Sequence, residues 1–360
     1  MKKLTFAGSL LCLSFAAHAQ SSVTIYGLLD EGFTYVTNEG GSHGAALQDS
    51  IQYPSVFGLK GAEDLGGGTK AIFNLTSQFS VNTGALIIPS DEFNRTAMVG
   101  LSSSSYGTVT LGNQYSFMMD SLFFGGFDAA YTYGGLYNLR QGPFAKLGVP
   151  QNPTGQFEFD MVGAPASVPN SIKYVTPDFN GFTAGAMYGF GGVAGSFGED
   201  RTMSYTVNYR HGDFAASAAY LDTRYAALDA GLDSIRNYGA GLKYKFYGVN
   251  YNLLFTDTRN TLTNAEIRVI QVGANRRFAT AWLIGANYQY MKGNAQLANN
   301  KASQFTAAVQ YWLSKRTDIY VEGVFQQAGG DGPAFAWING LTPSSSSRQT
   351  AMRIGLATQF

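Results

Sequence analysis

Apolar and polar side chains alternate over long stretches of this chain. Because successive side chains of a β-strand point to opposite faces, a period of two predicts strands with one apolar and one water-facing side. Each alternating segment has about the ten residues that cross a bilayer in a tilted strand. The clearest such segments are residues 71–81, 203–209, 238–246, 249–255, 282–290, 305–313 and 319–325.

Tight turns alternate with longer connections between these segments. The tight turns are rich in Gly, Asn, Asp and Pro, which favour turns for steric and hydrogen-bonding reasons. Short turns on one rim and long loops on the other are typical of outer-membrane barrels, whereas a soluble antiparallel sandwich explains only the alternation. Eight long loops predict sixteen strands with both termini on the short-turn side. The long connections are roughly residues 37–51, 83–92, 112–168, 191–201, 224–235, 257–265, 292–302 and 328–347.

The two ends of the chain carry different signals. Lys2, Lys3, an apolar run over 4–16 and the small-x-small sequence 17–19 predict a signal peptide over 1–19, cleaved after Ala19, and a mature chain of 20–360. The apolar run is shorter than the about 20 residues of a membrane-spanning helix, and no later run is long enough. At the other end, alternating residues 352–360 predict a last strand that ends at Phe360 and closes a barrel against 23–35.

Composition excludes several classes of function. The only cysteine, Cys12, lies in the predicted leader, so the mature chain has no thiol for a disulfide, a metal site or a nucleophile. This suits an oxidising compartment. Without Lys2 and Lys3, the 24 basic residues become 22 against 24 acidic ones, a net charge of about −2, which predicts no nucleic-acid partner.

Several motifs resemble those of the Gram-negative general porins of the β-proteobacterial type. The resemblance implies an all-β, sixteen-stranded antiparallel transmembrane β-barrel in the outer membrane, with a third outer loop folded inward. It also implies a homotrimer of water-filled channels that pass ions and small hydrophilic solutes and need no cofactor. Outer-membrane lipid, lipopolysaccharide and the barrel-insertion machinery, which reads the terminal Phe360, are the further expected partners. The motifs are 22–30, 57–68, 93–101, 107–115, 170–174, 313–318 and Phe360, in the family's order.

The connection between Gly112 and Pro169 is the expected constriction loop, since so long a connection usually has a function. It is net acidic, with Arg140 and Lys146 as its only bases. The resemblance places wall bases at three positions, which we expect to face loop acids and create a transverse field. Each base could instead be a solvated charge or a local ion pair. The wall bases are Lys60, Arg95 and Lys173, and the loop acids are chiefly Asp120 and Asp128, beside Glu158 and Asp160.

Two features qualify this hypothesis. Arg95 shares its strand parity with Ala97, Val99 and Leu101, which in a regular strand would also face the lumen, and a β-bulge could re-aim part of that strand. Val56 and residues 164–169 lack bases that relatives often carry. Since fewer wall bases then face an acidic loop, we expect weak ion selectivity of undetermined sign.

The same loop is rich in aromatic residues, which allows two interpretations. Aromatic faces could guide sugars or aromatic solutes through a substrate-preferring channel, or the rings could simply pack the loop. An enzyme is not expected, because His43 and His211 lie on opposite rims and form neither a catalytic group nor a metal-binding pair. The aromatic residues are Phe117, Phe123, Phe124, Phe127, Tyr131, Tyr133, Tyr137 and Phe144.

Overall fold

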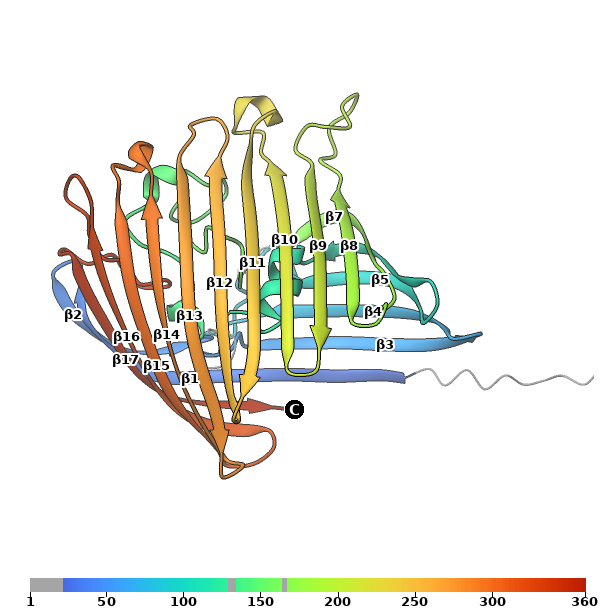
Figure 1. The fold of residues 1–360 in the computed structure, drawn as a ribbon, viewed down its shortest axis with the longest axis horizontal. Coiled ribbons are helices and arrows are strands. Elements are labelled where there is room, and N and C mark those ends of the chain that lie inside the picture. The colour runs from blue at the N-terminus through green and yellow to red at the C-terminus, as the bar shows by residue number, and fades with distance from the viewer. Residues whose placement is uncertain (1–21, 129–133, 164–166) are drawn as a thin grey trace, which may run out of the picture.

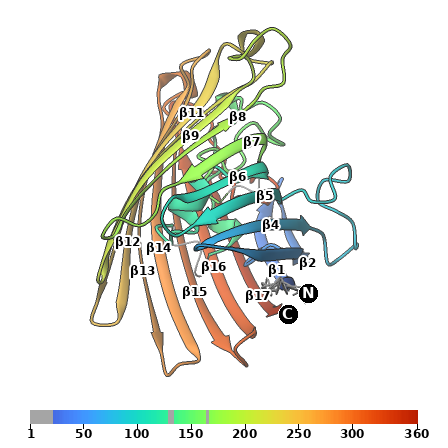
Figure 2. The same cartoon turned by 90° about the vertical axis from the view of Figure 1, so that its right-hand side faces the viewer.

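A closed antiparallel sheet forms the wall of the molecule (Figure 1, Figure 2). The structure, a computed structural model, describes residues 22–128, 134–163 and 167–360. The predicted leader and Cys12 lie outside these ranges. The strands are β1 (Ser22–Glu39), β2 (Ser42–Asp49), β3 (Val56–Gly66), β4 (Thr69–Gln78), β5 (Thr96–Ser103), β6 (Gly107–Gln114), β7 (Val168–Val175), β8 (Phe182–Gly189), β9 (Thr202–His211), β10 (Phe214–Arg224), β11 (Ser234–Phe246), β12 (Val249–Asn260), β13 (Glu266–Phe278), β14 (Trp282–Gly293), β15 (Lys301–Trp312), β16 (Thr317–Gly329) and β17 (Arg348–Gln359).

The first and last strands close the barrel. β1 pairs with β17 from Leu28 opposite Gln359 to Val36 opposite Ala351. On its other edge, β1 pairs with β3 near the chain start and with β2 further on, so β2 and β3 together occupy one position in the wall. The seventeen strands therefore make sixteen wall positions, which confirms the predicted sixteen-stranded barrel.

The second wall position differs from its prediction. We expected residues 37–51 to form a loop, but most of them continue β1 or form β2. The tight turn between the two strands is possible because Gly40 and Gly41 adopt positive φ angles of 65° and 111°. The break in the wall comes later, where residues 50–55 leave the sheet before β3 begins.

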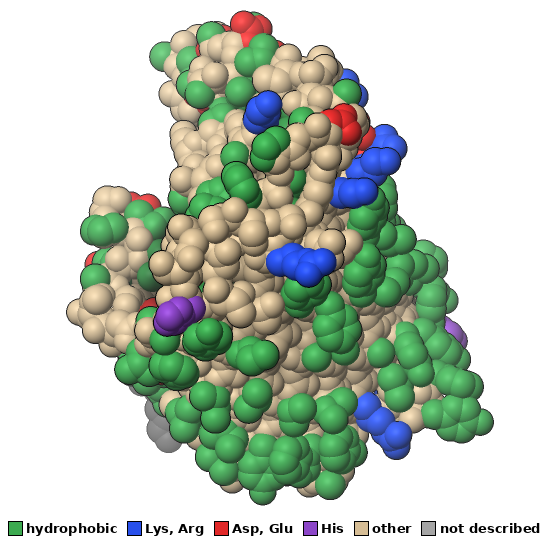
Figure 3. Space-filling view, turned by 90° about the vertical axis from the view of Figure 1, so that its left-hand side faces the viewer, with side chains coloured by type: hydrophobic (Ala, Val, Ile, Leu, Met, Phe, Trp, Pro, Cys, Tyr) green, Lys and Arg blue, Asp and Glu red, His purple; other side chains and the backbone are tan. Residues whose placement is uncertain are grey.

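Alternation along the strands separates an apolar outer face from a polar inner one. On β17, Met352, Ile354 and Leu356 are exposed, whereas Arg353 between them is 2% exposed. Figure 3 shows exposed hydrophobic side chains gathered in a band around one side of the barrel. A barrel whose outer face contacts lipid needs this arrangement. Within the described ranges, no helix has the length and apolar character to cross a membrane.

A buried ion pair joins the closing strands to the break in the wall. Arg353 of β17 contacts Asp30 of β1, with 3.4 Å between Nη2 and Oδ2, and both side chains are fully buried. The same Asp30 carboxylate accepts hydrogen bonds from the backbone N–H groups of Ile51 and Gln52 at 2.8 and 2.9 Å. The Tyr320 hydroxyl donates to Asp30 at 2.6 Å. These contacts hold residues 51 and 52 inside the wall.

Replacing Arg353 by Met should destabilise the barrel, because Asp30 would keep a buried charge without its counter-charge. Breaking a buried ion pair in this way costs about 3–5 kcal/mol. Urea-dependent unfolding in detergent micelles measures the loss. Arg348→Gln is the control, since Arg348 is exposed on the same strand. Equal unfolding midpoints for the two variants would show that the ion pair does not hold the seam.

Candidate functional site: the lumen and its inner loop

The described residues of the segment between β6 and β7, 115–128, 134–163 and 167, form an inner loop that packs on the inner side of the barrel. It contains the short helices η1 (Met118–Phe123), η2 (Leu136–Asn138) and η3 (Ala145–Leu147). Polar side chains on the inner faces of several strands hydrogen-bond to it. These bonds are Asn237 to Phe159 O (2.9 Å), Asn252 to Gly126 O (2.6 Å), Asn260 to Leu147 O (2.9 Å), Gln289 to Asn138 Oδ1 (2.8 Å) and Gln304 to Tyr137 O (3.0 Å).

An open passage of about 2290 Å³ remains inside the barrel. Its lining combines side chains from β3 to β7 with residues of the inner loop and, near the short turns, with Asn250, Asn275 and Arg277 of β12 and β13. Polar groups such as Thr76, Gln78, Asn94 and Gln114 line the wall side, and Met119, Asp120 and Phe124 line the loop side. Because the loop hydrogen-bonds to the inner faces of β11 to β15, the passage lies mainly against the opposite wall and reaches β12 to β15 only near their short turns.

Arg140 holds the inner loop together. Its side chain is fully buried and bonds to Asp128, to Asp160 at 2.8 Å, to Val162 O at 2.9 Å and to Gln271 of β13 at 3.2 Å. We had expected Asp128 to face a wall base, but it pairs with Arg140 of the loop itself. It is 1% exposed and does not line the passage. The sequence hypothesis missed Arg140 as the partner because only the fold brings residues 128, 140 and 160 together.

Lys173 and Asp120 form an ion pair in the lining of the passage. Lys173 lies on the inner face of β7, and Asp120 belongs to η1. Their side chains form an ion pair, and the Lys173 ammonium also donates to Tyr115 O at 2.8 Å. It lies 5.1 Å from the centre of the Phe117 ring. The structure thus brings together one of the expected wall bases and one of the expected loop acids.

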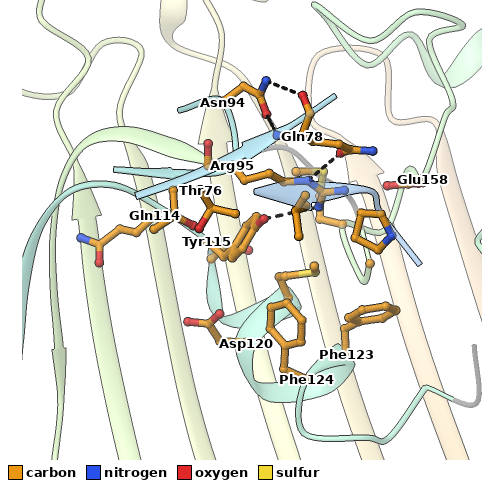
Figure 4. Close-up of a pocket in the computed structure, with 18 of the residues that line it drawn as sticks. Thr76, Gln78, Asn94, Arg95, Gln114, Tyr115, Asp120, Phe123, Phe124 and Glu158 are labelled. Carbon is orange, nitrogen blue, oxygen red and sulfur yellow. Dashed lines mark hydrogen bonds between the residues drawn. The ribbon is translucent and has the colours of Figure 1, made fainter. Parts of the chain in front are cut away.

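Arg95 also points into the passage, but from outside a regular strand. It precedes β5, which begins at Thr96, and its guanidinium donates to Gln78 Oε1 at 2.7 Å and to the Tyr115 hydroxyl at 3.3 Å (Figure 4). No bulge is needed, because Val99 and Leu101 face outward within the strand and are more than half exposed. Strand parity does not fix the direction of Arg95, because β5 begins only at Thr96.

Glu158 is a lining residue that the sequence hypothesis did not pair with Arg95. Its carboxyl group is 1% exposed, and Asn339 donates to it at 3.4 Å. Burial raises the pKa of Glu158 to about 8, although the positive charge of Arg95 opposes this shift. Near neutral pH the Arg95 charge is therefore not fully balanced by this carboxyl group. No local sequence pattern could link Glu158 to Arg95, because 63 residues separate the two positions in the chain.

Lys60 lies apart from the other two wall bases. It is an exposed residue on β3 at the parity of Val56, which lines the passage, and its ammonium lies 5.1 Å from the centre of the Tyr26 ring. Among the described residues it forms no ion pair with Asp120 or Asp128.

The loop aromatics divide between packing and lining. Phe117, Phe127, Tyr137 and Phe144 are buried, with at most 3% exposure each. In contrast, Phe123 and Phe124 line the passage, with ring centroids 5.5 Å apart in an edge-on arrangement. Tyr131 and Tyr133 lie outside the described residues. Most of the described rings therefore stabilise the loop.

The two histidines among the described residues, His43 and His211, lie beside aromatic rings. The His43 ring centre is 6.2 Å from that of Tyr35, and the His211 ring centre is 6.5 Å from that of Tyr209. The described part of the chain contains no group of three or more His, Cys, Asp or Glu side chains arranged to hold a metal ion.

Comparison with known proteins identifies the family. The family model described as Gram-negative porin matches residues 6–331. The chain belongs to the Gram-negative porin family. Among its relatives, outer membrane porin protein 32 of Delftia acidovorans is 32% identical over 89% of this chain and 88% of the relative. An outer membrane porin protein of Bordetella pertussis is 25% identical over the full length of both chains.

Solved structures share the fold of this porin. The anion-selective porin from Comamonas acidovorans matches with a TM-score of 0.78 and 24% identity, over 95% of this chain and 100% of the other. The trimer form of the Vibrio cholerae outer membrane protein OmpT matches with a TM-score of 0.66 and 14% identity, over 94% and 99%. The porin is accordingly an outer-membrane β-barrel that forms a channel for passive diffusion of ions and small hydrophilic solutes.

Replacing Arg140 by Met should loosen the inner loop, because Asp128 and Asp160 would lose their shared buried partner. We expect noisier single-channel currents and an unfolding free energy lower by about 3–5 kcal/mol. Planar-bilayer recordings and urea unfolding measure the two effects. Lys146→Met, at an exposed base of the same loop, should leave both unchanged. Currents as quiet as those of the parent protein would contradict this role of Arg140.

Proposed function

We propose that the narrow part of this porin lies between wall residues Arg95 and Lys173 and the loop residue Asp120, and that these groups give the channel weak ion selectivity. The pairing of Lys173 with Asp120 supports this most directly, because each charge offsets the other. Arg95 hydrogen-bonds to neutral partners, and its charge is only partly offset by Glu158. The expected solutes are small hydrophilic molecules and ions that fit the passage.

The name of the Comamonas relative bears on the sign of the selectivity. That protein is an anion-selective porin, and this chain shares its fold. Here the uncharged Val56 lines the passage, and one of the two wall bases at the constriction is paired. Because the remaining charge is small, we propose a preference of only a few-fold in either direction.

The same proposal includes a homotrimer of channels and no catalytic activity. Exposed apolar side chains on β1 and β5 supply an outer face for contact between barrels, among them Val23 (66%), Ile25 (62%) and Val99 (57%). The trimer form of the Vibrio protein is an example of a barrel of this fold that assembles into a trimer. Conductance steps in threes would support the trimer. Hydrolysis of lipid or peptide by the purified protein would contradict the absence of catalysis.

Replacing Arg95 by Gln should shift the reversal potential in a salt gradient toward cations, since one positive charge leaves the narrow part of the channel. Recordings in planar bilayers with a tenfold KCl gradient measure the shift. Arg348→Gln, on the outer face of β17, is the matched control and should not move the potential. A parent channel with strong anion preference would overturn the proposal of weak selectivity. An unchanged potential for Arg95→Gln would remove this residue from the constriction.

Deleting Phe360 should reduce assembly in cells several-fold, while channels that do assemble should keep their conductance. The Phe360 backbone exchanges hydrogen bonds with Gly27 at 3.1 and 3.2 Å, and its ring occupies the space that a Gly27 side chain would need. We therefore propose that it completes the seam and serves as the assembly signal. Heat-modifiable protein in outer-membrane fractions measures assembly. Phe246→Ala, at an equally exposed short-turn aromatic, is the control, and equal assembly of the two variants would refute the assignment.

A further inference from the structure

Four basic residues lie on the inner wall beyond the loop, toward the short turns. They are carried by β9, β11 and β13, which stand close together in Figure 1 with their short turns at one end. None of them belongs to the constriction described above. They are Arg210 of β9, Lys243 and Lys245 of β11, and Arg277 of β13.

The strand register places all four on the inner face. Lys245 is opposite Asn250, which is opposite Asn275, and both asparagines line the passage, as Arg277 does. The Lys243 ammonium donates to Gly125 O of the inner loop at 2.9 Å. Arg210 and Lys243 are both opposite Ala215 of β10, so they share a face and a level in the barrel.

Neighbouring members of this set are close enough for their fields to overlap, whereas Arg210 and Arg277, on β9 and β13, lie about 19 Å apart across four strand spacings. Two strands that flank a third lie about 10 Å apart, and residues i and i+2 of one strand about 7 Å apart. These spacings are no larger than the Debye length of about 10 Å in 0.1 M salt. An anion in this part of the lumen would therefore be attracted by several bases at once.

Little on the wall offsets these charges. Among the described residues, none of the four bases forms an ion pair. Two acids lie near the set without an ion pair to it. Asp213 directly precedes β10, and its backbone carbonyl accepts the Lys245 N–H at 3.0 Å. Asp318 is the register partner of Trp312, which stacks against the Arg277 guanidinium at 4.0 Å from the ring centre. By contrast, Lys70 on the far wall is directly opposite Asp64.

The long-loop side of the passage has the opposite charge. There the acids in the lining outnumber the two bases, Arg95 and Arg224. The acids are Asp49, Asp91, Glu92 and Asp200, besides the protonatable Glu158. The lumen therefore changes sign along its axis. Fixed charges in a narrow aqueous passage raise the local concentration of the opposite ion, so the two mouths should favour different ions.

We propose that Arg210, Lys243, Lys245 and Arg277 form a binding site for small polyanions that carry two or more carboxylate or phosphate groups, entered from the short-turn side. The fixed guanidinium of Arg277 suits a planar carboxylate, and the two lysines supply mobile ammonium groups. The site rests on the porin being an open channel, and it lies apart from the Arg95 constriction. A polyanion bound there narrows the passage for other ions.

Block of KCl current by citrate tests the proposal in planar bilayers. Citrate is added to one compartment at a time, and we expect much stronger block from one side than from the other. The triple variant Arg210→Gln/Lys243→Gln/Lys245→Gln should weaken the stronger block. Three bases about 7 Å from a bound charge contribute about 20-fold in water, which screening at 0.1 M salt reduces to about fivefold.

Arg276→Gln is the matched control, because Arg276 adjoins Arg277 on β13 but has the parity of the outer face. It should keep the parent's sided block, and Arg277→Gln should weaken that block. Equal block from both sides, absence of block, or full block in the triple variant would each overturn the site. Loss of conductance without citrate would instead count against the open channel, so the two failures are distinguishable.

Discussion

Closure of the hydrogen-bonded wall is the constraint on which the rest of this structure depends. In the hydrocarbon region no water can pair with an open strand edge, so every backbone group needs a partner within the barrel. Here the last edge is removed by β17, which pairs with β1 over nine successive residue pairs. Once the wall is closed, the period of two assigns each side chain to lipid or to the lumen.

The polar inner face of the wall contacts the inner loop along some strands and the open passage along others. Along β11 to β15, asparagine and glutamine side chains saturate the backbone carbonyls of the inner loop, whose own turns leave these groups unpaired. Along β3 to β7, similar side chains face the open passage. The position of the loop therefore decides which polar residues are structural and which contact solutes.

The sequence predicted the features that depend on local periodicity. Alternation, short turns and the terminal strand led to sixteen wall positions and to the pairing of both ends. It could not show that residues 50–55 leave the sheet, because Asp30 and Arg353, which hold them, are far apart in the chain. For the same reason Asp128 was matched with the wall and not with Arg140. Strand parity places Lys243 and Lys245 on the face of Gly241, but the charge pattern that they form with Arg210 needs the register across β10.

The break at residues 50–55 has a mechanical consequence. At Asp30 the wall is joined on this edge by one backbone bond, from Ser50 N–H, and by the Ser55 hydroxyl, where a regular ladder would continue. The Ile51 carbonyl just beyond accepts the Leu136 N–H of the inner loop at 2.6 Å. Local opening of the wall should start where adjacent strands share the fewest backbone hydrogen bonds. At residues 50–55 this motion would reach the inner loop that borders the passage. We therefore expect fluctuations in the width of the open channel to originate at the second wall position.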